Sequence, residues 1–159
     1  MKKSQTARFL GSAMVALLSV TGCSEFFASK SYAGLNAKNI EFDANTYPTV
    51  VLGGGVGGMT AAVYLAMANI KTLLVQGPTP GGLLTQSLSV RNWPGELETP
   101  GLAVTDKLLA QARKQGVEVV TEQLVSIDTK KWPYSLELAD VTDASKKRIV
   151  RALSVIVAT

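Results

Sequence analysis

The sequence of 159 residues contains no histidine and only one cysteine, Cys23. The lack of histidine excludes a histidine-based catalytic triad and a metal site with histidine ligands. A single cysteine cannot form a disulfide or a Cys-x-x-Cys pair within these residues. We therefore identify no catalytic residue and no metal-binding residue in the sequence.

The net charge is also small once residues 1–22 are left out. The formal net charge is +4, but residues 1–22 contain Lys2, Lys3 and Arg8 and no acid, so they account for three of those charges. A nearly neutral remainder gives no reason to expect a nucleic-acid partner. The hydrophobic fraction of 47% supports a buried core, and the length suits one domain.

Residues 1–22 have the pattern of a lipoprotein-type signal peptide. A basic start precedes the apolar run 9–20, which is too short to span a bilayer comfortably. Val20-Thr21-Gly22-Cys23 resembles a bacterial lipobox, which implies lipidation of Cys23 after cleavage; the alternative is a buried or incidental thiol. Residues 23–46 are polar and predicted to be a tether. We therefore expect an exported protein, lipid-anchored to the membrane and facing the periplasm or the cell exterior.

The most informative segment is residues 49–75, TVVLGGGVGGMTAAVYLAMANIKTLLV. Residues 50–52 are apolar, partly β-branched and followed by glycines, so they are predicted to form a buried strand. Residues 57–69 are predicted to form a helix, because apolar residues recur there near helical spacing, and their small size suits close packing on a sheet. Residues 71–75 are predicted to form a second, parallel strand because they are almost entirely apolar.

Gly53, Gly55 and Gly58 match the pattern G-x-G-x-x-G between that strand and that helix. The first glycine permits the tight turn, the second lets a pyrophosphate approach the backbone, and the third lets the helix pack on the strand. The helix N-terminus, at Val56 and Gly57, would direct unpaired N–H groups and the positive end of its dipole toward phosphates. The alternative is a glycine-rich turn with no ligand, but the flanking strand and helix favour binding.

Gln76 departs from this pattern. After the second strand, an Asp or Glu usually holds the ribose hydroxyls of the dinucleotide. An amide can still hydrogen-bond a ribose, but without the charge, which weakens the case for NAD at this site.

A second segment carries a family resemblance. Gly81-Gly82-Leu83-Leu84-Thr85, followed by VRNWPG at residues 90–95, resembles the G-G-Q-L-T loop and E-N-W/F-P-G segment of low-molecular-weight thioredoxin reductases. The resemblance extends over about residues 47–159. It implies an α/β fold, a Rossmann-like FAD-binding domain with a parallel sheet, helices and a small antiparallel β-meander. Residues 47–159 would be the first, incomplete part of that FAD/NAD(P)-binding domain.

The resemblance also implies the residues of an FAD site. They are Gly53, Gly55, Val56, Gly57, Gly58, Gln76, Gly81, Gly82, Leu83, Thr85, Asn92 and Leu124. By resemblance, the first glycines hold the pyrophosphate, Gly82, Thr85 and Asn92 line the flavin end, and Leu124 contacts adenine through its backbone. Two residues depart from the family pattern: Leu83 stands where Gln is usual, and Arg91 where Glu is frequent.

The remaining elements are predicted from local patterns. A helix is expected with Thr99 as its N-cap, Pro100 as its first position and Gly116 as its stop. Strands are expected at residues 117–120, 124–127, 134–138 and 148–153, with a final parallel strand at 154–158.

The resemblance implies a thioredoxin-disulfide reductase-type oxidoreductase, in which electrons pass from NADPH through FAD to a thioredoxin-like disulfide partner. The Cys-x-x-Cys pair and the NADPH fingerprint would lie beyond Thr159, so we expect these residues alone to be inactive and the complete protein to be a homodimer. Two alternatives remain. One is a flavoprotein resembling ferredoxin–NADP reductase, with ferredoxin as partner, and the other is a non-catalytic lipid-anchored fragment.

Overall fold

The computed structural model describes residues 43–159. The predicted signal peptide, Cys23 and nearly all of the predicted tether lie outside the described residues. The elements follow one another as β1 (Thr46–Leu52), α2 (Val56–Met67), β2 (Thr72–Val75), the 3-10 helix η2 (Gly82–Gln86), α3 (Gly101–Lys114), β3 (Glu118–Val120), β4 (Glu122–Asp128), β5 (Tyr134–Asp140) and β6 (Lys147–Val157). In this part of the chain, no helix is long and apolar enough to cross a membrane.

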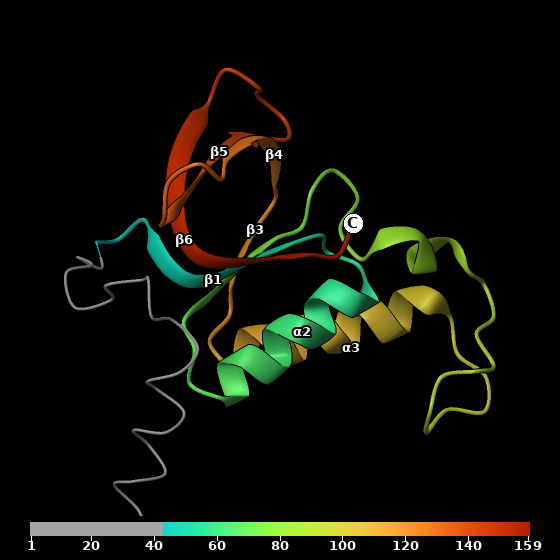
Figure 1. The fold of residues 1–159 in the computed structure, drawn as a ribbon. Helices are drawn as coiled ribbons and strands as arrows, with labels where there is room; N and C mark the ends of the chain where they lie inside the picture. The colour runs from blue at the N-terminus through green and yellow to red at the C-terminus, as the bar shows by residue number, and fades with distance from the viewer. Residues whose placement is uncertain (1–42) are drawn as a thin grey trace, which may run out of the picture. The chain divides into compact units, whose positions relative to one another are not determined.

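The strands form one six-stranded sheet in the order β3-β2-β1-β6-β5-β4. β3, β2, β1 and the second half of β6 run parallel, and Val51 of β1 lies between Leu74 of β2 and Ile156 of β6. Helices α2 and α3 lie together on one face of this parallel part (Figure 1). β4, β5 and the first half of β6 form an antiparallel meander, so the predicted α/β fold class is confirmed.

β6 corrects one sequence-based prediction. The two strands expected at 148–153 and 154–158 are a single strand of 11 residues. Ala152 pairs with Tyr134 of β5 on one side and with Tyr47 of β1 on the other, so the chain stays extended while it changes partner. The sequence suggested two elements because the meander and the parallel sheet were each given a strand of their own, whereas one extended strand pairs with both.

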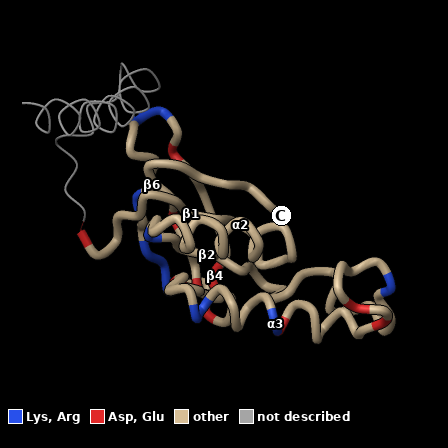
Figure 2. Tube along the Cα trace, turned by 90° about the horizontal axis from the view of Figure 1, so that it is seen from below, with Lys and Arg blue, Asp and Glu red and all other residues tan. Residues whose placement is uncertain are grey.

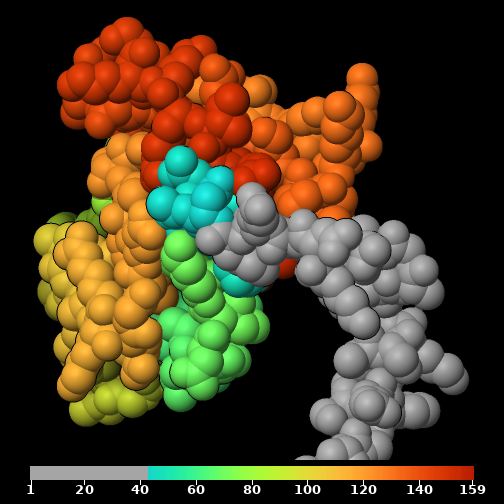
Figure 3. All heavy atoms as spheres, turned by 90° about the vertical axis from the view of Figure 1, so that its left-hand side faces the viewer, coloured from blue at the N-terminus to red at the C-terminus, as the bar shows by residue number. Residues whose placement is uncertain are grey.

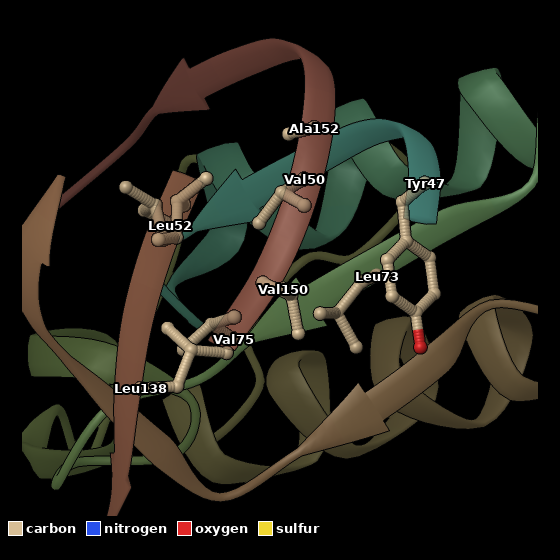
Figure 4. Packing of buried hydrophobic residues seen from close by; sticks show 9 residues of the cluster. Tyr47, Val50, Leu52, Leu73, Val75, Leu138, Val150 and Ala152 are labelled. Carbon is tan, nitrogen blue, oxygen red and sulfur yellow. The ribbon is translucent and has the colours of Figure 1, made fainter. Parts of the chain in front are cut away.

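Two apolar cores lie on opposite faces of the parallel strands. One lies between α2, α3 and the sheet, and it includes Val51, Met59, Ala62 and Leu74. The other lies between the parallel strands and the meander, and Figure 4 shows its side chains converging from β1, β2, β5 and β6. Its buried members are Tyr47, Val50, Leu52, Leu73, Val75, Leu136, Leu138, Val150 and Ala152. Val50 and Leu52 of β1 therefore serve one core and Val51 between them serves the other, as the two-residue period of a strand requires.

The same layering is visible on the molecular surface. In Figure 3, the orange and red atoms of the meander lie above, the green and gold atoms of the helical layer lie below, and β1 in cyan lies between them. Only Thr121 separates β3 from β4, although these strands are at opposite ends of the sheet order. The sheet therefore curls until its two edges meet.

The ends of α3 have clear physical causes. The helix begins one residue later than predicted, with Pro100 as N-cap, because Thr99 pairs with Val90 through two backbone hydrogen bonds of 2.8 and 3.0 Å. It ends at Lys114, and Gly116, just after the C-cap Gln115, has a left-handed φ of 89° that stops the helix there. Helix α2 begins one residue before the predicted range 57–69 and ends two residues before its end. It ends there because Asn69 has a left-handed φ of 59°.

Candidate dinucleotide-binding site

A groove of about 590 Å³ opens at the carboxyl ends of the parallel strands. Its walls come from the ends of β1, β2 and β6, from the turns 53–55 and 76–79, and from Gly82, Leu83, Gln123 and Leu124. In open α/β sheets this is the edge at which ligands bind. The groove therefore has the position that the glycine pattern predicts.

The turn between β1 and α2 has no room for side chains at two of its three motif glycines. A Cβ at Gly53 would run into the carbonyl group of Ala158, and Gly53 has a φ of 115°. A Cβ at Gly58 would run into the carbonyl oxygen of Gly53. Gly55 differs, because no atom lies within 4 Å of where its Cβ would stand. The second glycine thus leaves open space beside the backbone, as close approach by a ligand requires.

The N-terminus of α2 is available to an anion. Gly55 is the N-cap and provides no side-chain cap, and the first turn contains no acidic residue. The first N–H groups of a helix lack intrahelical partners, and here they belong to Val56, Gly57 and Gly58. Together with the helix dipole they provide a positive end that suits a phosphate.

Gln76 has the most unusual environment in the groove. Its backbone is fixed by two hydrogen bonds, from its N–H to the carbonyl of Val120 at 3.0 Å and from the N–H of Gly54 to its own carbonyl at 3.2 Å. The residue is only 5% exposed, yet its side-chain Nε2 has no hydrogen-bond partner among the described residues. A buried donor without a partner is costly, and a ligand acceptor in the groove would satisfy it.

A second hollow of about 450 Å³ continues the groove. The two share Gly55 and Leu83, and the hollow extends to Val56, Gly81 and Asn92. The loop before η2 reaches this position through left-handed φ angles of 84° at Gly81 and 68° at the next glycine. The N–H of Gly81 also donates to the carbonyl of Gly54 at 3.0 Å, which ties this loop to the glycine turn.

The structure therefore brings most of the sequence-predicted residues to one continuous surface. Those that line the groove or the hollow are Gly53, Gly55, Val56, Gln76, Gly81, Gly82, Leu83, Asn92 and Leu124. Gly58 instead holds α2 against β1, and Gly57 is exposed in the first turn of the helix. Thr85 lies apart, beside a small hollow next to α3, and its hydroxyl donates to the carbonyl of Gly82 at 2.8 Å.

Sequence reasoning missed several lining residues. Gly54 is buried, and a Cβ there would lie 2.7 Å from the Cβ of Gln76. Thr79 and Gln123 line the groove from the loop after β2 and from β4. The run of three glycines was a local signal for Gly54, and Thr79 belongs to the loop that follows β2, whereas Gln123 reaches the groove because the sheet curls.

The charged side chains and the shifted pKa values of the described residues lie outside the groove. No side chain lining the groove is charged, and no group of metal-ligating residues occurs in residues 43–159. The raised pKa of Tyr47 has burial as its main cause, followed by its hydrogen bond of 2.9 Å to Glu118. Tyr47 lies near the start of β1, so this shift belongs to the opposite end of the strand from the groove.

Known proteins resemble this chain in sequence and in fold. A family profile described as pyridine nucleotide-disulphide oxidoreductase matches residues 47–159. The thioredoxin reductase of Vibrio cholerae serotype O1 is 40% identical over 88 residues, which are 55% of this chain and 28% of that protein. Glucosaminate ammonia-lyase of Pseudomonas fluorescens is 38% identical over 88 residues, which are again 55% of this chain and 28% of that protein. The solved thioredoxin reductase of Giardia duodenalis superposes with a TM-score of 0.66 at 26% identity, over 72% of this chain and 36% of that one.

The chain spans about a third of the length of these relatives. The matched region contains the glycine turn, the groove and the whole described sheet. The fold is the Rossmann-like FAD-binding fold of the thioredoxin reductase structures. This chain belongs to the pyridine nucleotide-disulphide oxidoreductase family.

Proposed function

We propose that these residues form the first FAD-binding segment of an oxidoreductase of the thioredoxin reductase type. The observation that carries the proposal is the continuity of the groove and the second hollow, which meet at Gly55 and Leu83 beside the N-terminus of α2. A dinucleotide has a pyrophosphate between two larger ends. The surface offers an anion site between two hollows, which is the matching arrangement.

The pyrophosphate would bind at the glycine turn. Gly55 leaves the backbone open, and the first-turn N–H groups of α2 supply donors without any nearby acid. The close contacts of Gly53 and Gly58 fix the position of this helix end relative to β1. The residues present therefore fit a phosphate-containing cofactor.

The adenosine end would lie in the main groove. Gln76 offers the buried Nε2 that lacks a partner, and its position after β2 suits contact with the ribose. Leu124, at the edge of β4, lines the same part of the groove and is 37% exposed. The base would lie against this apolar wall, while the ribose satisfies the amide.

The flavin end would lie in the second hollow, beside Leu83 and Asn92. When bound, FAD would supply the redox chemistry, since no described side chain in the site can carry electrons. The role of the chain would be to bind and orient FAD and to exclude water from it. Leu83 is 80% exposed and apolar, so it would cover one side of the isoalloxazine ring but offer it no hydrogen bond.

The donor and acceptor follow from the relatives. We propose NADPH as the electron donor, a thioredoxin-like disulfide protein as the acceptor, and a homodimer as the complete assembly. Two of the relatives described above are thioredoxin reductases, which supports thioredoxin as the substrate. The similarity to an ammonia-lyase shows that this segment occurs beside a different named activity, so the acceptor rests on residues other than these.

The FAD assignment can be tested by titrating the complete protein, to which this FAD-binding segment would belong, with FAD, ADP and FMN in a calorimeter. FAD and ADP should compete for one site, and FMN, which lacks the adenosine and the pyrophosphate, should bind more weakly. Preference for FMN, or no binding of FAD or ADP, would contradict the proposal.

A pair of variants at Gly55 separates charge from size. Gly55→Asp should lower the affinity for FAD at least about tenfold, because a carboxylate would face the phosphates. Gly55→Asn places a neutral group of the same size at the same position and should weaken binding less. Both residues are good N-caps, so thermal unfolding should show that neither variant destabilises α2. Equal affinities for the two variants would show that no anion binds there.

We further propose that Cys23 is lipidated and holds the exported protein at a membrane. The support is the sequence alone, which places the only cysteine of the chain after a basic start and a short apolar run. Cys23→Ala should move the protein from the membrane fraction to the soluble fraction. Unchanged fractionation would refute the anchor.

A further inference from the structure

One wall of the groove comes from a corner of the sheet rather than from the parallel strands. Gln123 and Leu124 of β4 supply this wall. Thr121 alone separates β4 from β3, and these strands are at opposite ends of the sheet order. In the described part of the chain, one backbone hydrogen bond joins β4 to the loop after β2, from the N–H of Gly77 to the carbonyl of Glu122 at 2.9 Å. A single bond allows the strand to swing about it, so the position of the wall depends on side-chain contacts as well.

Arg148 of β6 contacts this corner with its guanidinium group. Its Nε donates to Oε1 of Glu122 at 2.8 Å and its Nη2 donates to Oε2 at 2.9 Å, so both carboxylate oxygens are bound. The two side chains are 32% and 19% exposed, whereas every other ion pair of the described residues has a basic partner at least 46% exposed. A bidentate contact that is partly shielded from water fixes the geometry of its partners better than an exposed pair.

The register of the meander connects Arg148 to the wall of the groove. Arg148 pairs with Leu138 of β5, and Leu138 pairs with Leu124 of β4. Directly paired residues lie on the same face of a sheet, so these three form one row across the meander. Glu122 stands two residues before Leu124 and therefore on the same face, beside this row. The row and the ion pair together tie the wall to β6, which is also paired with β1.

The ion pair can affect the groove through position rather than through charge. No side chain that lines the groove is charged, and neither Arg148 nor Glu122 is among the lining residues. Helix α2 has no charged residue either, and Figure 2 shows it as an uninterrupted tan tube, in contrast to α3. A ligand in the groove would meet backbone groups and neutral side chains, and the ion pair determines where those of β4 lie.

We propose that Arg148 is a positioning residue for the adenosine end of the groove, because its bidentate contact with Glu122 holds Gln123 and Leu124 beside the loop after β2. The proposal rests on the proposed function, since it takes the groove to be the adenosine end of a dinucleotide site. Loss of the contact would let the start of β4 move away from Gly77 and widen the groove. The glycine turn and the second hollow would keep their positions.

The test measures the affinity of the complete protein, freed of FAD, for ADP by calorimetry. ADP is the probe because it contains the adenosine and the pyrophosphate but no flavin. Arg148→Lys keeps the positive charge, but an ammonium group cannot reproduce the planar two-bond contact with the carboxylate. This variant should therefore bind ADP about fivefold to tenfold more weakly than the wild type.

Arg151→Lys is the matched control, because it makes the same substitution on the same strand. Arg151 binds Asp43 at 2.6 Å, and neither residue lines the groove. This variant should bind ADP within about twofold of the wild type. Circular dichroism and thermal unfolding will show that both variants are folded at the temperature of the titration.

Glu122→Gln breaks the same contact from β4, and it decides the proposal if Arg148→Lys does not fold. It should weaken ADP binding about as much as Arg148→Lys does. The double variant should lose no more affinity than either single variant, because both substitutions remove one shared contact.

Hydrogen exchange followed by mass spectrometry gives a second measurement that needs no ligand. The amide of Gly77 and the first residues of β4 should exchange faster in Arg148→Lys than in the wild type, and at the wild-type rate in Arg151→Lys. A general loss of stability would instead accelerate exchange throughout the sheet.

Three results would count against the proposal, and they are distinguishable. ADP binding within about twofold of the wild type in folded Arg148→Lys would overturn it and leave the proposed function intact. Equal losses in Arg148→Lys and Arg151→Lys, or additive losses in the double variant, would show that the contact with Glu122 does not position the wall. Failure of both FAD and ADP to bind the wild type would overturn the proposed function, and this inference with it.

Discussion

Gly58 touches the carbonyl oxygen of Gly53 so closely that no side chain could stand at position 58. The contact lets the first turn of α2 rest directly on the end of β1, and Gly58 is buried there. Two backbones meet where side chains would normally keep them apart. The position of the helix N-terminus, and with it the anion site, depends on this contact.

Gly58→Ala should lower the free energy of unfolding by about 1–3 kcal/mol, the usual cost of overpacking a buried site. Gly57→Ala is the control in the same turn, because its Cβ would meet no atom within 4 Å. That variant should be neutral or slightly stabilising, since alanine favours a helix over glycine. Urea denaturation measures both, and equal losses would show that the contact with Gly53 is not the cause.

Tyr47 should make stability fall at alkaline pH. Burial, followed by the hydrogen bond to Glu118, raises the pKa of Tyr47 above its usual value. Its contribution to stability is therefore complete below the unfolded-state pKa, about 10, and is lost as the pH rises through the higher folded-state pKa. Denaturation between pH 8 and 11 should show a shallower decline for Tyr47→Phe than for the wild type.

Tyr64→Phe is the control for this measurement, because Tyr64 is 68% exposed on α2. It should reproduce the wild-type decline. If Tyr47→Phe also reproduced it, burial of the Tyr47 hydroxyl would not be the source of the alkaline loss.

Leu138 should be essential for the packing of the meander on the parallel strands. Its side chain is completely buried in the core that Figure 4 shows. Leu138→Ala should cost about 2–5 kcal/mol of unfolding free energy, because it leaves a cavity between the two layers. Leu97→Ala, at a residue 97% exposed, should change it by less than about 0.5 kcal/mol. Similar losses for both would mean that the meander does not close this core.

Asp43 should stabilise the start of β1 except at strongly acidic pH. The hydroxyl of Thr46 is the main cause of its lowered pKa, with a further contribution from Arg151, which donates to it at 2.6 Å. The stabilisation is therefore present above about pH 4 and is lost as the pH falls through the lower folded-state pKa. Melting temperatures between pH 2.5 and 6 should depend less on pH in Asp43→Asn.

Asp106→Asn provides the comparison for that series, since it makes the same change of charge on an exposed position of α3. It should leave the acid dependence of the melting temperature as in the wild type. A flatter profile in this variant too would assign the effect to net charge rather than to the contacts of Asp43.

Local sequence predicted the elements that have strong local causes. The strand–glycine–helix unit is present because an apolar run, a turn that tolerates no side chains and a row of small helical residues each act within a few residues. The stop of α3 at Gly116 follows from the left-handed conformation that glycine allows. The start of α3 was placed one residue too early, because the pairing of Thr99 with Val90 is not visible in the local pattern.

The residues of the candidate site also differ in whether local sequence could predict them. Gly53, Gly55 and Gly58 could be identified from spacing, because their roles depend on the backbone of one turn. The environment of Gln76 could not be predicted from the sequence, since its burial depends on Gly54 from the turn after β1 and on Val120 from β3.

The sequence by itself therefore determined the glycine turn between β1 and α2 and the order of most elements, because each depends on contacts between near neighbours, and its motifs identified the family. The tertiary structure decided that β6 is one strand shared by two layers, that the curled sheet brings Gln123 and Leu124 beside the turn, and that Gln76 lies buried with an unpaired amide. These features arise from pairing between strands far apart in the chain. Residue patterns within one strand do not specify which partner that strand will meet.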